Sequence, residues 1–96
     1  MNVMSIPLST GSIQLDYEII DAIFALDSHK EGILGSVDPG KAFEGVKRQL
    51  RHICRELGGD AVIYCQFEYR NTTADGFLGK KPAIEIFAYG TAVKYL

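Results

Sequence analysis

Three segments of this chain are rich in Ile, Val, Phe and Tyr, and apolar residues recur at helical spacing along a fourth. This pattern predicts strands over residues 17–26, 61–69 and 83–95, in which successive side chains point to opposite faces of a sheet. Between the first two strands, apolar residues recur every three or four positions from about residue 39 to 57, which predicts an amphipathic helix. The predicted order is therefore strand, helix, strand, strand.

The predicted helix has signals at both ends. Asp38 can accept hydrogen bonds from the first backbone N–H groups, and Pro39 suits the first helical position because its missing N–H costs nothing there. Gly58 supplies the left-handed residue that commonly ends a helix. At 100° per residue, one stripe of the helix is apolar: Phe43, Val46, Leu50, Ile53, Cys54 and Leu57. The opposite stripe is basic, so we expect one helix face to pack on the sheet.

Alternation also assigns the strand residues to two faces. In the first strand, one face is expected to carry Ile19, Asp21, Ile23 and Ala25, and the other Ile20, Ala22, Phe24 and Leu26. In the second strand, we expect a shared face for Ala61, Ile63, Cys65 and Phe67. In the third strand, the face made by Ile84, Ile86, Ala88 and Ala92 is expected to lie opposite Phe87, Tyr89, Thr91, Val93 and Tyr95.

The remaining segments are expected to connect these elements. Residues 1–12 mix Ser, Thr, Gly and Pro and predict an N-terminal arm or short edge strand. Residues 27–37 predict a connection, and residues 70–82 predict a flexible hairpin loop. Because 96 residues suffice for one core, we expect a single domain over residues 1–96. The predicted fold class is α+β, with a three-stranded antiparallel sheet covered by one main helix.

One helix can cover only one face of such a sheet, so the second face is expected to stay exposed in a single copy. Its aromatic side chains would be Phe24, Tyr64, Phe87, Tyr89 and Tyr95. A contiguous apolar patch of this kind rarely stays in water on a monomer, and symmetric homo-oligomers are common. We therefore expect self-association. The alternative is a monomer in which residues 1–16 fold back over the second face.

Composition and charge narrow the function classes. Ten Lys and Arg against twelve Asp and Glu leave a net charge of −2, so the chain has no overall attraction to nucleic acid or anionic lipid. The first residues carry neither a basic region nor a long apolar run, and no stretch approaches the ~18 apolar residues of a membrane helix. Two cysteines are too few for a disulfide framework, so we expect reduced thiols and a cytoplasmic location.

Two glycine-containing segments resemble a known family. Leu57-Gly58-Gly59-Asp60-Ala61-Val62 is similar to the helix end and strand start of the YbjQ family, and Gly90-Thr91-Ala92-Val93 is similar to its last strand. Ile6-Pro7-Leu8 and Phe67-Glu68-Tyr69 support the likeness. The resemblance implies a small α+β fold, dodecin-like or YbjQ-like, that assembles as a ring-shaped pentamer. The family is labelled heavy-metal-binding, and its matching residues indicate a fold rather than a reaction.

That label directs attention to the soft and borderline metal ligands Cys54, Cys65 and His29, which would suit a divalent ion of the same class. No C-x-x-C or H-x-x-H spacing occurs, and His52 lies about 200° around the helix from Cys54, so these two cannot hold one ion. The thiols have two interpretations. They form a metal-binding or oxidant-sensing pair between helix and strand, or they pack in the core as small hydrophobes, as buried free cysteines usually do.

Two further groups are candidate binding residues. An anion could bind the basic helix face through Arg48, Arg51 and Arg55, although a solvated face is the simpler interpretation. A ligand cleft or an interface between copies could be lined by Tyr64, Phe87, Tyr89 and Tyr95.

No nucleophile elbow, phosphate loop or triad spacing is present, so we expect no enzyme activity and assign no catalytic residue. Two functions remain open. One is a non-enzymatic oligomer that binds a heavy metal or small ligand. The other is a structural or interaction module that acts through homo-oligomer assembly without metal. Neither a membrane nor a nucleic acid is expected as a partner.

Overall fold

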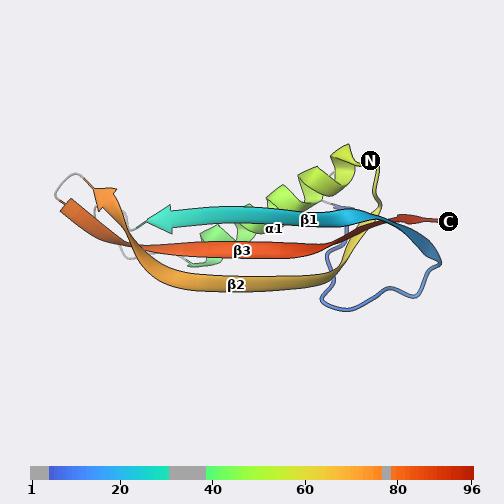
Figure 1. Ribbon diagram of the computed structural model, residues 1–96, viewed down its shortest axis with the longest axis horizontal. Helices are drawn as coiled ribbons and strands as arrows, with labels where there is room; N and C mark the ends of the chain where they lie inside the picture. The colour runs from blue at the N-terminus through green and yellow to red at the C-terminus, as the bar shows by residue number, and fades with distance from the viewer. Residues whose placement is uncertain (1–4, 31–38, 77–78) are drawn as a thin grey trace.

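The computed structural model describes residues 5–30, 39–76 and 79–96. Its elements follow the predicted order, with one helix between the first and second strands of an antiparallel sheet (Figure 1). They are β1 (Tyr17–Lys30), α1 (Pro39–Glu56), β2 (Ala61–Gly76) and β3 (Gly79–Tyr95). The order across the sheet is β1-β3-β2, and β3 pairs antiparallel with both neighbours. The α+β class and the single covering helix are therefore confirmed.

The helix packs its apolar stripe on one face of the sheet, except that the predicted stripe residue Leu57 follows the end of α1 and is 44 % exposed. Val46, Leu50 and Cys54 are fully buried there. Small and branched side chains of the strands form the other side of this core, including Ile23, Ile86, Ala88 and Ala92. The predicted faces of β3 are confirmed, because Ile84, Ile86, Ala88 and Ala92 all join this core while Val93 and Tyr95 lie in a second cluster. The predicted helix cap Asp38 lies outside the described residues.

The N-terminal arm is a short edge strand, which confirms one of the two predicted forms. Leu8 forms a parallel bridge with Val62 on the outer edge of β2. Val62 N donates to Pro7 O at 3.0 Å, and Ser9 N donates to Val62 O at 2.9 Å. Ile6, which is 1 % exposed, is buried in the same core as the helix. The arm thus adds a short fourth strand to the three long ones.

The predicted hairpin loop over residues 70–82 is wrong for the residues that the structure describes, 70–76 and 79–82. The β2–β3 ladder continues from Arg70 opposite Glu85 as far as Gly76 opposite Gly79. This part of the hairpin lacks the apolar alternation that marks a half-buried strand, and ion pairs such as Arg70–Glu85 at 2.7 Å join its strands instead. The predicted connection over residues 27–37 also begins too early, because β1 pairs with β3 as far as Lys30. The rest of that segment lies outside the described residues.

Two bulges overturn part of the predicted face assignment. The register of β2 shifts between Ile63 and Gln66, and Tyr64 has a positive φ of 53°. As a result, Ala61 and Ile63 belong to the cluster on the second face, while Cys65 belongs to the helix-side core. A bulge inserts one extra residue and so reverses the alternation beyond it.

In β1, the register shifts between Ile19 and Asp21. Ile20 packs against the helix-side core, and Ile19 is 69 % exposed. The predicted placement of these two residues is therefore reversed for the same reason.

The molecule is elongated, at 53 × 23 × 17 Å. Its radius of gyration is 15.6 Å, whereas a compact chain of this length is expected near ~12–13 Å. Figure 1 shows the cause: the β2–β3 hairpin continues as a two-stranded ribbon beyond the end of β1. A ribbon of two strands buries little surface by itself.

Candidate functional site

The two thiols lie in one place, the core between α1 and the sheet. Cys54 is 0 % exposed and Cys65 is 1 % exposed. Cys54 Sγ donates to Ala61 O at 3.5 Å, and Cys65 Sγ donates to Val62 O at 3.7 Å. A Cβ at Gly59 would lie 2.6 Å from Cys54 Sγ, so this glycine leaves the room that the sulfur occupies. The helix and the bulged strand therefore bring into one core two residues that lie eleven positions apart in the sequence.

Burial raises the pKa of both thiols. For Cys54, desolvation is the largest cause, followed by the charge of Asp60. For Cys65, desolvation again dominates, while a backbone hydrogen bond from Ser9 and the charge of Arg51 lower the pKa by less. Both groups are therefore neutral thiols near pH 7, and the thiolate is the form that binds metal.

Among the described residues, no third metal ligand lies beside the thiols. Over the part of the chain that the structure describes, no group of three or more His, Cys, Asp or Glu side chains could hold a metal ion. The side chain of His29, the third predicted ligand, lies outside the described residues. The geometry of Cys54 and Cys65 resembles core packing more closely than a preformed metal centre.

The second face of the sheet carries an exposed aromatic patch, which we define as Phe24, Leu26, Phe87 and Tyr89. Phe24 and Leu26 are each 58 % exposed. The rings of Phe24 and Phe87 stack at 6.1 Å, and those of Phe87 and Tyr89 lie 5.6 Å apart. These residues share a face because Phe24 pairs with Tyr89 and Leu26 pairs with Phe87.

An open hollow of about 370 Å³ adjoins the aromatic patch where the hairpin leaves the sheet. Leu26 and Phe87 form its apolar part. The ion pair of Arg70 with Glu85 contributes polar groups to its lining. The patch is thus continuous with a concave surface that has both apolar and charged groups, a combination typical of contact surfaces.

The other predicted aromatic residues lie elsewhere. Tyr95 packs with Tyr17 and Ile13 over a small cluster at the far end of the second face. Tyr64 is 53 % exposed at the β2 bulge. Of the predicted ligand or interface set, the aromatic patch therefore includes Phe87 and Tyr89 but not these two. The alternative in which residues 1–16 fold back over the second face is met only in part among the residues described: Ile13 packs on the cluster near Tyr95, and Phe24 and Leu26 stay exposed.

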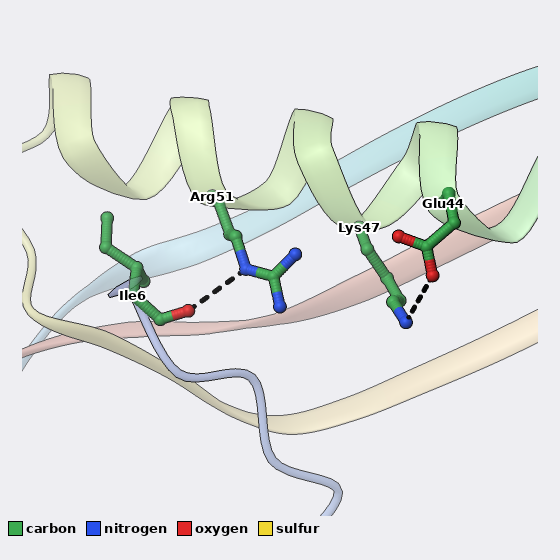
Figure 2. Close-up of polar contacts among 4 residues, drawn as sticks. All are labelled: Ile6, Glu44, Lys47 and Arg51. Atoms are coloured by element: carbon green, nitrogen blue, oxygen red, sulfur yellow. Dashed lines mark hydrogen bonds and ion pairs between the residues drawn. The ribbon is translucent and has the colours of Figure 1, made fainter. Parts of the chain in front are cut away.

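The predicted anion-binding arginines are separated. Arg51 Nε donates to Ile6 O at 3.1 Å, so this side chain turns toward the arm (Figure 2). Arg48 lines a different hollow, together with Asp27 and His52. Arg55 is exposed near the helix end. None of the described hollows is lined by all three arginines.

Sequence comparison now decides the family. A family model described as "Putative heavy-metal-binding", the YbjQ model, matches residues 41–96, which is more than half of the chain. The chain belongs to the YbjQ family. The matched region begins in α1 and includes both cysteines, β2 and β3. The predicted resemblance is confirmed, and the description applies to the family as a whole rather than to a ligand set in this chain.

Two relatives extend the YbjQ likeness to nearly the whole chain. A UPF0145 protein of Enterococcus faecalis is 25 % identical over 109 aligned positions, which cover 96 % of this chain and 97 % of the relative. A solved structure from Pediococcus pentosaceus, a DUF74-family protein of unknown function, superposes with a TM-score of 0.65 at 22 % identity. That match covers 93 % of this chain and 96 % of the other. It supports the fold, one helix on an antiparallel sheet.

Some features of the site were not predicted. The β2 bulge brings Cys65 against the arm, where Ser9 O accepts from Cys65 N at 2.8 Å. A hint was present in the sequence, because Ser9 and Thr10 stand in a turn-rich segment, but nothing there indicates which strand edge the arm will join.

In the residues that the structure describes, no helix is long and apolar enough to span a membrane.

Proposed function

We propose that this YbjQ-family protein is a non-enzymatic homo-oligomer whose copies associate through the aromatic patch on the second face of the sheet. The observation that carries the proposal is the exposure of this patch. α1 covers one face only, and the arm reaches only the opposite end of the second face. Phe24, Leu26 and Phe87 therefore remain 58 %, 58 % and 38 % exposed in one chain.

The energetics favour burial of the patch against other copies. Covering a half-exposed aromatic or leucine side chain contributes roughly 1 kcal/mol or more. Three such side chains on each of two copies supply an amount comparable to the lower estimates of the cost of association, which begin near ~4 kcal/mol. The adjoining hollow and the projecting hairpin offer further surface. The family resemblance favours a ring of five, which would require each copy to present two different surfaces.

Light scattering at micromolar concentration tests the assembly. We expect the wild-type chain to show a mass that is a multiple of the 10.6 kDa of one copy, and five copies would match the ring. The double substitution Phe24→Asp, Leu26→Asp should return the mass to one copy, because it places buried charges in the contact. Leu15→Asp is the matched control, since Leu15 is 57 % exposed outside the patch. A single-copy mass for the wild-type chain would reject the proposal.

A second candidate, metal binding by the thiol pair, follows from the joint burial of Cys54 and Cys65 in one core cluster. The charge that a thiolate would carry at Cys65 is among the lesser causes that raise the pKa of Cys54. A soft divalent ion would have to displace both thiol protons and find further ligands, such as His29 or groups of a neighbouring copy. The predicted cytoplasmic location would keep the thiols reduced for this role.

Elemental analysis of the purified protein tests this candidate, with Cys54→Ser and Cys65→Ser as matched variants. If metal binding is real, the wild-type chain co-purifies with metal or takes up added Cd²⁺, and either variant loses it. Because the thiol pKa values are raised, uptake should strengthen as the pH rises from about 7 toward 9. Absence of metal, together with thiols that resist labelling until the protein unfolds, would leave core packing as their role.

A further inference from the structure

A small hollow lies between the N-terminal arm and α1, and it is lined by one of the predicted anion-binding residues, Arg51, but not by Arg48 or Arg55. Its volume is about 170 Å³. Ser9 and Thr10 of the arm line one side, Lys47 and Arg51 of the helix line the other, and Cys65 and Phe67 contribute from β2. Two cationic side chains, two hydroxyl groups and an apolar wall therefore meet in one concave place.

Arg51 is held in position by the arm. Its Nε donates to the backbone oxygen of Ile6 at 3.1 Å. In Figure 2 the two terminal nitrogens of the guanidinium point away from Ile6, toward the side where Lys47 lies. These nitrogens carry four further N–H groups in a planar fork that suits carboxylate and phosphate oxygens. The bond to Ile6 thus orients the guanidinium for a ligand.

Lys47 adds a second positive charge one helical turn away. Its Nζ donates to Glu44 Oε1 at 2.9 Å, also drawn in Figure 2. An ammonium group has three N–H donors, so two remain after this bond. Ser9 Oγ accepts from Gly11 N at 3.1 Å and keeps its own O–H for donation. The polar groups of the hollow are therefore rich in donors.

The charged side chains that line the hollow are both cationic, and one of them, Lys47, is paired with the carboxylate of Glu44. No carboxylate is among the described residues that line it. The hollow beside the aromatic patch is lined by Glu68 and Glu85, and the one beside Arg48 is lined by Asp27. The positive charge of Arg51 also acts on Cys65 in β2. It lowers the pKa of this thiol, although burial raises that pKa by more.

We propose that the hollow between the arm and α1 binds a small oxyanion, a phosphate or carboxylate group, through Arg51, Lys47 and the hydroxyls of Ser9 and Thr10. The apolar wall at Phe67 would accept a short carbon chain attached to that group. The site is built within one chain and does not depend on the assembly proposed above. Its volume admits a single small headgroup rather than a nucleotide.

Titration of ¹⁵N-labelled protein followed by NMR tests the site. Inorganic phosphate is added in one series and acetate in another, both at constant ionic strength. We expect saturable shifts of the Ser9 and Thr10 amides and of the Arg51 Nε–H signal, and the tighter of the two series identifies the preferred headgroup. Shifts that never saturate in either series would overturn the proposal.

Matched charge-removing variants separate a specific site from general attraction. Lys47→Ala should weaken binding at least about threefold, because it removes a donor to the anion while leaving the Arg51–Ile6 bond in place. Arg48→Ala removes the same charge from the same helix but lines a different hollow, so binding should change less than about twofold. Equal weakening by both variants would mean that only the net charge matters and would also overturn the proposal.

The two proposals fail independently. The patch variant Phe24→Asp, Leu26→Asp should lose the assembled mass in light scattering and still bind the oxyanion. Lys47→Ala should keep the assembled mass and bind the oxyanion at least about threefold more weakly.

Discussion

At the scale of single residues, Tyr64 has the most informative backbone. It is the one non-glycine residue with positive φ, at 53°, among those the structure describes. A bulky side chain is rarely found there, because its Cβ crowds the neighbouring carbonyl oxygen. The surroundings hold this conformation in place: Tyr64 N donates to Gly11 O, and Cys65 N donates to Ser9 O. The bulge is therefore fixed by the arm, and it in turn positions Cys65.

Because the backbone of Tyr64 is strained, we expect an unusual order of stability between its glycine and alanine variants. Tyr64→Gly should be more stable than Tyr64→Ala by about 1 kcal/mol, because glycine adopts positive φ without steric cost. Chemical unfolding of both variants measures the difference. At Tyr89, an ordinary strand position, the same pair should show the opposite order, since glycine weakens a strand. If alanine were the more stable residue at Tyr64 as well, the bulge would not be strained.

The residues of β2 also show where inference from the sequence failed. The alternation of Ala61, Ile63 and Cys65 predicts a common face, and the structure separates them. Alternation assumes an uninterrupted ladder, and one inserted residue reverses every assignment beyond it. In β3, where no bulge occurs between Ile84 and Ala88, the same reasoning succeeded.

At the scale of elements, the N-terminal arm is part of the core although its sequence is that of a loop. Ile6 is buried beside Leu50 and Val62 in the helix-side cluster. The backbone of the arm pairs with β2, and its carbonyl at Ile6 accepts from Arg51. The arm therefore joins the helix to the edge of the sheet, and the small hollow exists because of this contact.

Truncating Ile6 should reveal how much the arm contributes. Ile6→Ala is expected to lower the free energy of unfolding by about 2–4 kcal/mol, as for a buried aliphatic residue. Amide exchange at Val62 and Cys65 should accelerate, because both donate to the arm. Leu15→Ala, at a position 57 % exposed, should stay within about 0.5 kcal/mol. A change that small at Ile6 would show that the arm is only loosely attached.

The hairpin illustrates the opposite error. Residues 70–82 contain Asn, Thr, Asp, Gly and Pro, a composition typical of loops. In the structure residues 70–76 and 79–82 extend the β2–β3 ladder, with Thr73 opposite Pro82 and Asp75 opposite Lys80. A ribbon beyond the end of β1 has little core to face, so its residues need no apolar alternation. Pairing to a neighbouring strand, rather than burial, keeps this segment extended.

At the scale of the whole molecule, shape and surface agree with the proposed assembly. A chain of 96 residues spread over 53 Å has a large surface for its core. One face of its sheet is covered by α1, and the other exposes the aromatic patch. These features favour a fold whose stability is linked to contact between copies.

That linkage predicts a melting temperature that depends on concentration. If copies associate in the folded state only, Tm should rise by about 5 °C or more between roughly 5 µM and 500 µM protein. Differential scanning calorimetry measures it. The variant Phe24→Asp, Leu26→Asp should melt at one temperature over the same range. A concentration-independent Tm for the wild-type chain would contradict the linkage.

Local periodicity was enough to specify the order of the elements, the buried stripe of α1, the faces of β3 and the surplus of aromatic residues on the second face. Each depends on which side of a single helix or strand avoids water, and that preference is written in neighbouring residues. The bulge at Tyr64, the docking of the arm, the length of the hairpin and the donor-rich hollow depended on the folded chain. Each of these depends on hydrogen-bond partners far away in sequence, such as Arg51 with Ile6, and periodicity carries no information about which distant backbone group will be the partner.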